Sequence, residues 1–257
     1  MAFLRATLAG HIVLTPCGNE VLLRDGAPLG KTTVLIDPGH GGPVDTGAVA
    51  PTGLPEKQLN LKVAEAVQVA LADWGIVAVL TRTADYSSPL YVRANLADTL
   101  GADLMVSIHH NAPNPPASAD PGIEVFVQNG SPQSERLGGL LWEYSMDALG
   151  EFEVDWVAAD DAGVMTVLNS RGDDAYGIIR HPETTTVLIE LGYMSNSAEA
   201  ELHEDPNYSK AVGAALAAAI DLYLTTEERG TGFVEGRIFD PRPGIARDAC
   251  IDPEMGN

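Results

Sequence analysis

The sequence predicts a three-layer α/β/α fold, in which a central, mostly parallel, twisted sheet of about six strands lies between helices. Short apolar runs bounded by glycine and proline alternate with longer amphipathic segments, and strands that alternate with helices form parallel sheets covered on both faces. The chain has 257 residues, and 45% of them are hydrophobic, which is sufficient for one sizeable core. Its length alone does not require a second domain.

The predicted strands are short apolar runs that end at turn-forming or charged residues. The apolar run at 34–36, for example, is followed by the segment DPGHGG at 37–42, whose Pro-Gly and Gly-Gly pairs end the strand abruptly. We place strands at 33–37, 76–81, 104–109, 122–128, 164–169 and 185–190.

The predicted helices carry apolar residues at the i, i+3, i+4 spacing of an amphipathic helix. The clearest spans 56–74 and is followed by Gly75, a residue type that commonly ends a helix. The last begins at Asp205-Pro206, an N-cap residue followed by proline at the first helical position, and continues to 223. Two further helices are placed at 90–100 and 132–149.

The two ends of the chain lack such patterns. Residues 1–32 are expected to form an irregular lead with one strand around 20–24, and the core domain is placed at 33–225. The segment 226–257 is rich in Gly, Pro, Asp and Arg without a period, which indicates a tail or linker. Cys17 and Cys250 lie in these ends and form no CxxC motif, which excludes a thiolate metal site; a disulfide between them and two free thiols both stay open.

Composition limits the partners of the chain. The formal net charge is −21, from 36 acidic and 15 basic residues, so nucleic acid is not expected as the main partner, because phosphate binding needs basic patches. No stretch approaches the ~20 apolar residues of a membrane span. The charge favours solubility and fits a salty or extracellular setting. We expect a secreted protein that has lost its signal peptide, since the short apolar run at 1–16 is interrupted and lacks a cleavage site.

Three polar residues stand at or just beyond the carboxyl ends of predicted strands, where the sites of α/β sheets gather. They are His40, His109 and Glu190. Glu56 opens the first long helix, where the macrodipole helps to keep a carboxylate ionised. Two histidines and a glutamate are a ligand set for catalytic zinc, whose fourth position is left to water. The pattern therefore predicts a zinc site with a catalytic base beside it.

Two neighbouring histidines compete for one ligand position. Adjacent side chains on a strand point to opposite faces, so His109 and His110 are not expected to bind the same ion. The other histidine is then expected behind the ligands or on the surface. Glu190 ends the apolar run at 185–190, and a carboxyl group buried there needs a partner. Beside zinc, it is placed to act as general base and then to protonate a leaving nitrogen.

Seven segments of the chain match a known pattern in order, over roughly residues 33–225: LIDPGHGG at 35–42, DTGA at 45–48, GLPEKQLNL at 53–61, LTR at 80–82, ADLMVSIHHNA at 102–112, GIEVF at 122–126 and VLIELGYMSN at 187–196. They resemble the zinc-dependent N-acetylmuramoyl-L-alanine amidases of the amidase-3 type, a group of bacterial cell-separation amidases and of sporulation and phage lysins. One departure follows Arg93, where Ala97-Asp98 replaces the family's usual Ala-Asn; we expect it to affect helix packing rather than chemistry.

The resemblance implies the α/β/α fold, zinc ligands at His40, Glu56 and His109, and Glu190 as the catalytic acid and base. The choice of His109 over His110 rests partly on it. It also implies hydrolysis of the amide that joins the lactyl group of N-acetylmuramic acid to L-alanine of the peptidoglycan stem peptide.

Three further residues near these segments leave their roles open. Arg180 either contacts a carboxylate of the stem peptide or pairs with nearby acids. Asn111 either binds substrate or caps its loop. Glu124, inside a predicted strand, is expected to be structural. Between 128 and 178 the sequence predicts one ordinary helix and loop, so we do not expect an inserted helix that blocks the zinc cleft, as some relatives carry.

The predicted function is that of a monomeric zinc amidase, secreted or associated with the cell wall, or periplasmic where the source has an outer membrane. Its predicted partner is peptidoglycan or a muropeptide. One alternative is a zinc peptidase or another amidohydrolase on the same scaffold. The other is a non-catalytic peptidoglycan-binding regulator, against which the intact set of four residues argues.

Overall fold

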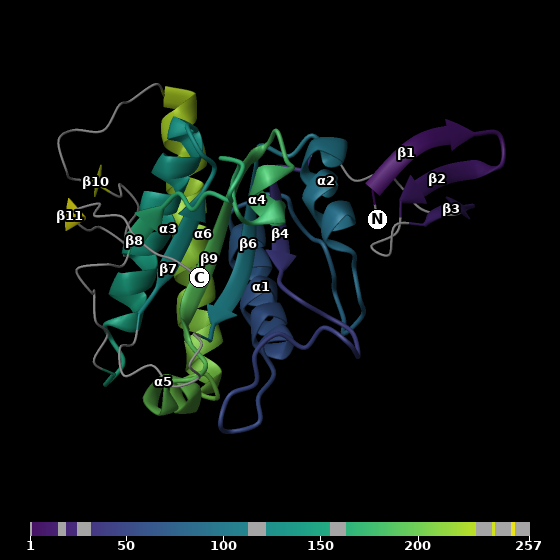
Figure 1. Cartoon of the computed structure of the whole chain (residues 1–257). Coiled ribbons are helices and arrows are strands. Elements are labelled where there is room, and N and C mark those ends of the chain that lie inside the picture. The colour runs from purple at the N-terminus through teal and green to yellow at the C-terminus, as the bar shows by residue number, and fades with distance from the viewer. Residues whose placement is uncertain are drawn as a thin grey trace.

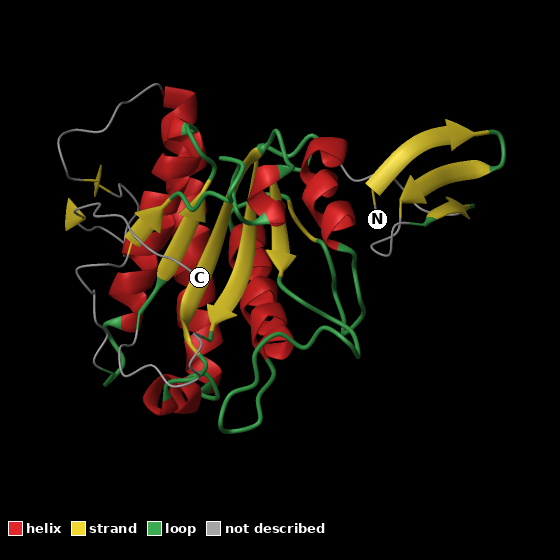
Figure 2. Cartoon of the chain, viewed as in Figure 1, coloured by secondary structure: helices red, strands yellow, loops and turns green. Residues whose placement is uncertain are grey.

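The computed structural model describes residues 2–14, 19–24, 32–112, 122–154, 163–229, 238–239 and 248–249. In this part of the chain, six strands form a central sheet and helices cover both of its faces (Figure 1, Figure 2). The strands of this sheet are β4 (Val34–Pro38), β5 (Ala78–Leu80), β6 (Leu104–Asn111), β7 (Glu124–Val127), β8 (Gly163–Met165) and β9 (Thr185–Tyr193). The helices are α1 (Glu56–Asp73), α2 (Leu90–Leu100), α3 (Pro132–Leu149), α4 (Gly177–Arg180), α5 (Ser197–Leu202) and α6 (Pro206–Arg229).

The central sheet has the strand order β5-β4-β6-β9-β7-β8. Its strands pair in parallel except for β7 and β9, which are antiparallel to each other. This confirms the predicted sheet of about six mostly parallel strands. The carboxyl ends of β4, β6 and β9 therefore meet at one edge, the lower edge in Figure 1, next to the amino end of β7.

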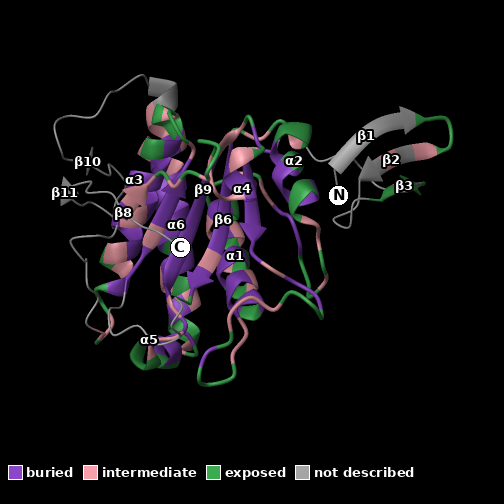
Figure 3. Cartoon of the chain, in the orientation of Figure 1, coloured by how far each residue is buried: buried purple, intermediate pink, exposed green. Residues whose placement is uncertain are grey.

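Two layers of helices enclose the sheet and create two apolar cores. Helices α1, α3 and α6 pack together on one face, and α2 and α4 pack together on the other. Alternation along β6 serves both layers: Leu104, Val106 and Ile108 join the first core, whereas Met105 joins the second. Because β6 is buried on both faces (Figure 3), its first five residues, LMVSI, are apolar except for Ser107.

Most predicted elements are present, with small shifts at their ends. Helices α1, α2 and α3 begin and end within one residue of the predicted ranges, because their apolar period and end signals are local. The strand predicted at 164–169 is only the three-residue β8. Helices α4 and α5 have four and six residues, too few to show a helical period in the sequence. Helix α6 extends past residue 226, where the sequence predicts a tail.

The N-terminal lead is more ordered than the sequence predicts. Strands β1 (Ala2–Thr7), β2 (Gly10–Leu14) and β3 (Glu20–Leu23) form a separate antiparallel sheet, whose first strand contacts α2 (Figure 1). The expected strand near 20–24 is confirmed as β3, but the expectation of an irregular segment is wrong for residues 2–14, which form β1 and β2. Short strands gain their order from pairing with one another, and a pattern read along single segments does not reveal that pairing.

Some expectations for the chain ends lie outside the described residues. Cys17 and Cys250 are among them, as is most of the predicted tail. Of that tail beyond α6, the structure describes β10 (Ile238–Phe239) and β11 (Asp248–Ala249), which pair antiparallel. Among the helices in the described residues, none has the length and apolar character needed to cross a membrane.

Candidate metal centre

His40 lies in the turn that follows β4. Its φ of 62° is in the left-handed region, which is unfavourable for a residue with a side chain and must be held by its surroundings. The N–H of Gly39 donates to the carbonyl of Ile108 on β6 at 2.9 Å. Asp45 Oδ1 lies 2.6 Å from His40 Nδ1, which leaves the other ring nitrogen, Nε2, facing Glu56. A carboxylate behind an imidazole in this way fixes both its orientation and its tautomer.

Arg82, which is fully buried, ties the His40 turn to the start of α1. Its Nε donates to the carbonyl of Pro38 at 3.0 Å, and its Nη2 donates to the carbonyls of Gly39 at 2.9 Å and Lys57 at 2.6 Å. Gly39 directly precedes the predicted ligand His40, and Lys57 directly follows the predicted ligand Glu56. Because the guanidinium group is planar and rigid, it sets the distance between the two backbone segments.

Asp37, at the end of β4, is a buried anion beneath the same turn. Arg93 Nη1 lies 3.1 Å from its Oδ2, Ser107 Oγ donates to Oδ2 at 2.8 Å, and Thr81 Oγ1 donates to Oδ1. Burial alone raises the pKa of Asp37, but the charge of Arg93 and the hydrogen bonds outweigh burial, and the pKa lies below its usual value. The ionised group therefore anchors the strand end from which the turn departs.

Glu56 is the first residue of α1 and is almost wholly buried. Its Oε2 accepts from the N–H of Ala48 at 2.9 Å, and its Oε1 accepts from Asn60 Nδ2 at 3.0 Å. The carboxylate also lies between two imidazoles, with Oε2 3.2 Å from His40 Nε2 and Oε1 3.0 Å from His109 Nδ1. Burial raises the pKa of Glu56, but the hydrogen bonds and charges of the two histidines outweigh it and hold the pKa well below its usual value.

His109, Glu190 and Glu124 form a row across three neighbouring strands. His109 on β6 pairs with Glu190 on β9, which pairs in turn with Glu124 on β7. Paired residues project to the same face of a sheet, so both carboxyl groups share the face of His109. His110 projects to the opposite face and is buried, so its alternative position on the surface is wrong.

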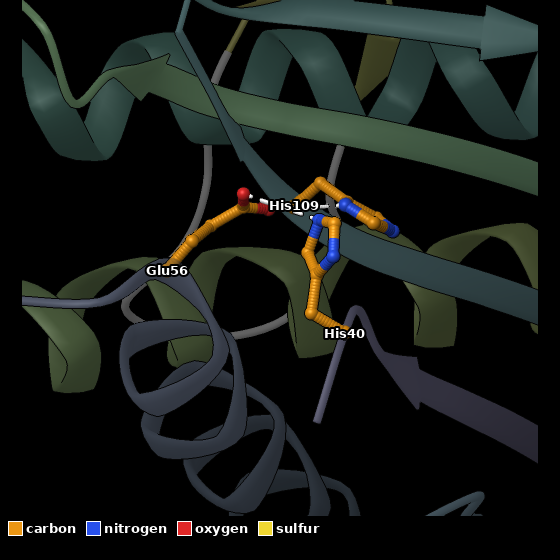
Figure 4. Close-up of side chains that lie close together, drawn as sticks. All are labelled: His40, Glu56 and His109. Carbon is orange, nitrogen blue, oxygen red and sulfur yellow. Dashed lines mark hydrogen bonds and ion pairs between the residues drawn. The ribbon is translucent and has the colours of Figure 1, made fainter. Parts of the chain in front are cut away.

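The structure brings the three predicted ligands together (Figure 4). The ligand atoms of His40, Glu56 and His109 all lie within 4.8 Å of one another. Donor atoms about 2.0–2.1 Å from a tetrahedral zinc ion are about 3.3 Å apart, close to the observed histidine–carboxylate distances of 3.0 and 3.2 Å. Two glycines make the approach possible: a Cβ on Gly39 would lie 2.2 Å from the His109 ring, and one on Gly47 would lie 2.4 Å from Glu56. The donor types and their spacing fit zinc.

The carboxyl groups of Glu190 on β9 and Glu124 on β7 have surroundings that differ from those of Glu56. The amide of Asn111 and the hydroxyl of Tyr193 both donate to Glu124, yet burial raises the pKa of Glu124 to about 7. Burial, together with the charges of Glu190 and Glu124, also raises the pKa of Tyr176, so its phenol stays protonated. The Asn111 amide is thus engaged within the protein, and its contact with substrate stays a prediction.

Arg180 is not brought to this edge of the sheet. It ends α4, before β9 begins, and its Nη1 donates to the carbonyls of Asp174 at 2.6 Å and Ala175 at 3.0 Å. His109 and Glu190 stand near the opposite ends of their strands. The contact of Arg180 with a stem peptide therefore also stays a prediction.

Sequence reasoning missed the residues that hold the predicted ligands in place. They are Asp45 behind His40, Asn60 behind Glu56, and Arg82, which joins their backbone segments. Polar and charged residues of these types usually lie on the surface, so the pattern alone does not separate them from solvent-exposed neighbours. The available signal was their position inside the matched segments 45–48, 53–61 and 80–82.

Comparison with known protein families and curated sequences adds to this geometry. The model of the Amidase_3 family, described as N-acetylmuramoyl-L-alanine amidase, matches residues 34–221. AmiA of Escherichia coli (strain K12), an N-acetylmuramoyl-L-alanine amidase, is 30% identical over 225 residues, which are 76% of this chain and 77% of AmiA. LytC of Bacillus subtilis (strain 168), also named as an N-acetylmuramoyl-L-alanine amidase, is 32% identical over 175 residues, which are 67% of this chain and 32% of LytC.

Solved structures show the same similarity. The catalytic domain of CwlV, an N-acetylmuramoyl-L-alanine amidase from Bacillus (Paenibacillus) polymyxa var. colistinus, is 30% identical and superposes with a TM-score of 0.64 over 76% of this chain and 98% of that domain. The amidase AmiC2 of Nostoc punctiforme is 29% identical, with a TM-score of 0.62 over 76% of this chain and 98% of that structure. The family match over residues 34–221 includes all six strands of the central sheet, and the superpositions cover about three quarters of this chain.

Proposed function

The chain belongs to the Amidase_3 family of N-acetylmuramoyl-L-alanine amidases, and from this premise we propose that it is a zinc-dependent enzyme of peptidoglycan turnover or lysis. The bond cut is the amide between the lactyl group of N-acetylmuramic acid and L-alanine of the stem peptide. The observation that carries the proposal is the convergence of His40, Glu56 and His109 at the carboxyl edge of the sheet.

The proposed zinc ligands are His40 through Nε2, His109 through Nδ1 and the Glu56 carboxylate, the atoms that face one another. A bound zinc ion supplies Lewis-acid activation of the scissile carbonyl and of water. The chain itself keeps these donors in place. Asp45 orients His40, and the amide of Asn60 with the N–H of Ala48 orients Glu56.

Glu190 is the proposed general base and acid. Its support is its position, since it is buried on the strand next to His109 and projects to the same face. In this role it takes a proton from the attacking water and passes it to the nitrogen of L-alanine as the amide breaks.

The proposed place of action is outside the cytoplasmic membrane, in the wall or, where an outer membrane exists, in the periplasm, because the substrate lies there. We propose residues 33–225 as the catalytic domain, which the family match over 34–221 supports. A monomer is the proposed active form.

Metal analysis combined with digestion of defined muropeptides tests this function. We expect one zinc ion per chain, and new L-alanine amino termini without new reducing ends of muramic acid. A chelator abolishes the reaction and added zinc restores it, whereas His109→Ala lowers zinc occupancy. Cleavage within the stem peptide would indicate a zinc peptidase. Stoichiometric zinc without cleavage at any pH or salt concentration would indicate a non-catalytic wall-binding protein.

A further inference from the structure

His110 is a buried polar residue that the proposed reaction does not use. It continues the row of Leu104, Val106 and Ile108, which project from β6 into the apolar core against α1, α3 and α6, and it is only 1% exposed. An imidazole buried at such a position is unfavourable unless its nitrogens are hydrogen-bonded. Both ring nitrogens have partners, and these lead in two directions.

The first direction leads to the metal centre through Asn60. Asn60 Nδ2 donates to Glu56 Oε1 at 3.0 Å and to the carbonyl of Gly39 at 3.3 Å. Both partners only accept, so the amide nitrogen must face them, and Oδ1 of Asn60 then faces His110 Nδ1 at 2.7 Å. Because Oδ1 also only accepts, Nδ1 of His110 carries the proton. His110 thereby determines which atom of Asn60 faces the Glu56 carboxylate.

The backbone of His110 reinforces this arrangement. Its N–H donates to the same Oε1 of Glu56 at 3.2 Å. A substitution of the side chain leaves this backbone contact in place, so the contribution of the imidazole can be measured separately.

The second direction leads to the strand of the proposed base. His110 Nε2 lies 2.9 Å from the hydroxyl of Tyr208 on α6, and this hydroxyl donates to the carbonyl of Leu191 at 2.8 Å. Leu191 directly follows Glu190 on β9. One connected set of buried groups on α1, β6 and α6 therefore reaches from the ligand Glu56 to the residue beside the base.

We infer that His110 is a positioning residue of the metal centre, which holds Asn60 in the orientation that fixes Glu56. This inference rests on the proposed zinc site and concerns the affinity of that site. Loss of a hydrogen-bonding partner behind a metal ligand typically weakens metal binding by about 10–100-fold.

Two variants of nearly equal shape test the role of the imidazole. In His110→Asn, the side-chain amide places an N–H group where Nδ1 stood. In His110→Leu, a side chain of similar size and branching places a methyl group there. Both variants lose the contact with Tyr208 and leave the same space, so a purely structural role affects them equally. We expect the zinc Kd, measured by competition with a chelator, to rise about 10–100-fold in His110→Leu and to stay within about threefold of the parent in His110→Asn.

His203 offers a matched control. It is also 1% exposed, its ring centroid lies 5.0 Å from that of His110, and its ring nitrogens have no hydrogen-bond partner among the described residues. We expect His203→Leu to leave the zinc Kd unchanged even where it lowers Tm. Visible absorption of the Co²⁺-loaded protein is a second measurement, and we expect altered bands only in His110→Leu.

Three outcomes decide the inference. Equal zinc affinity in His110→Leu and His110→Asn would overturn it, and so would an equal loss of affinity in His203→Leu. A parent protein that binds no zinc, with His109→Ala indistinguishable from it, would instead refute the proposed metal centre and, with it, the inference drawn from it.

Discussion

Asp37 and Glu199 are both completely buried carboxyl groups, but they have opposite tendencies to ionise. Asp37, beneath the His40 turn, is paired with Arg93, and its pKa lies below its usual value. Glu199, on α5 beyond β9, accepts the N–H of Tyr193 at 2.7 Å, and within the described residues no cation pairs with it. Burial raises the pKa of Glu199 to about 8. Equal burial thus gives opposite charge states, because the neighbours differ.

The same difference separates the two halves of the candidate site. On the β4 half, hydrogen bonds and the two histidines hold the pKa of Glu56 well below its usual value, which suits a metal ligand. On the β9 and β7 half, burial raises the pKa of Glu124 to about 7, next to the proposed base Glu190. One half keeps a carboxylate ionised, whereas the other holds a carboxyl group, that of Glu124, whose pKa lies near neutrality.

The largest expected effect comes from removing the proposed base on the β9 half of the site. We expect Glu190→Gln to lower turnover on the order of 10⁴-fold, because the base is lost, with little change in zinc affinity. Muropeptide kinetics and chelator competition measure the two quantities. Glu183→Gln, an exposed position just before β9, is the control and changes neither. Loss of zinc together with turnover would show that Glu190 is a ligand instead.

The next effect tests the ion pair on the β4 half. Arg93→Leu leaves Asp37 buried without its counter-charge, and we expect the free energy of unfolding in urea to fall by about 3 kcal/mol. Arg171, whose side chain is 76% exposed and lies 3.3 Å from Asp173, forms the matching surface pair. Arg171→Leu is expected to change stability by less than about 0.5 kcal/mol. Equal effects of the two substitutions would contradict the importance of burial.

The third prediction tests the opposite pKa shifts of Glu199 and Asp37. Because the pKa of Glu199 is raised to about 8, the folded protein retains a proton that the unfolded chain loses near pH 4.5, so Glu199 makes stability fall as pH rises between these values. The slope from one such group is at most about 1.4 kcal/mol per pH unit. We expect Glu199→Gln to remove this part of the slope in urea unfolding curves at pH 5 to 8.

Asp37 makes the corresponding prediction at low pH. Its pKa is lowered, so the stability that it contributes is present above pH 3.8 and is lost as pH falls through the folded value. Glu199→Gln should leave this loss of stability at low pH unchanged. Stability curves of the parent and of Glu199→Gln that run parallel between pH 5 and 8 would contradict the protonated state of Glu199.

The smallest expected effect concerns the partly exposed carboxylate behind His40. We expect Asp45→Ala to weaken zinc binding by about 10-fold, because the imidazole loses the group that orients it. Asp45→Asn keeps an oxygen that can accept from Nδ1 and is expected to retain most of the affinity. Zinc competition assays on both variants separate two explanations. Orientation of the ring predicts a large loss of affinity only in Asp45→Ala, whereas a simple effect of charge predicts equal losses in both variants.

Much of the fold could be predicted because its signals are local. The apolar period of α1, the glycine after it and the abrupt end of β4 all lie within a few residues of the elements they define. The three-stranded N-terminal sheet was missed because each strand depends on its partner. The short helices α4 and α5 were missed because they complete too few turns.

The candidate site was predictable to the extent that residue type and strand position define it. His40 and Glu56 could be chosen because metal-binding side chains at strand and helix ends are informative in themselves, whereas the choice of His109 over His110 rested partly on the family resemblance. The supports were not predictable in this way. Arg82 and Asn60 acquire their roles only through contacts with the turn after β4, which lies far from Arg82 in the sequence.

The sequence by itself determined most elements of the sheet, the residue types at the proposed metal centre and the opposite faces of His109 and His110, because these depend on local spacing and alternation. Only the tertiary structure decided that Glu190 lies beside His109, that Glu124 joins this row and that Arg180 lies at the other end. It also decided that His110 meets Asn60 and Tyr208. The physical reason is that strand order and helix packing bring distant segments together, and hydrogen bonds and pKa shifts depend on those neighbours rather than on position in the chain.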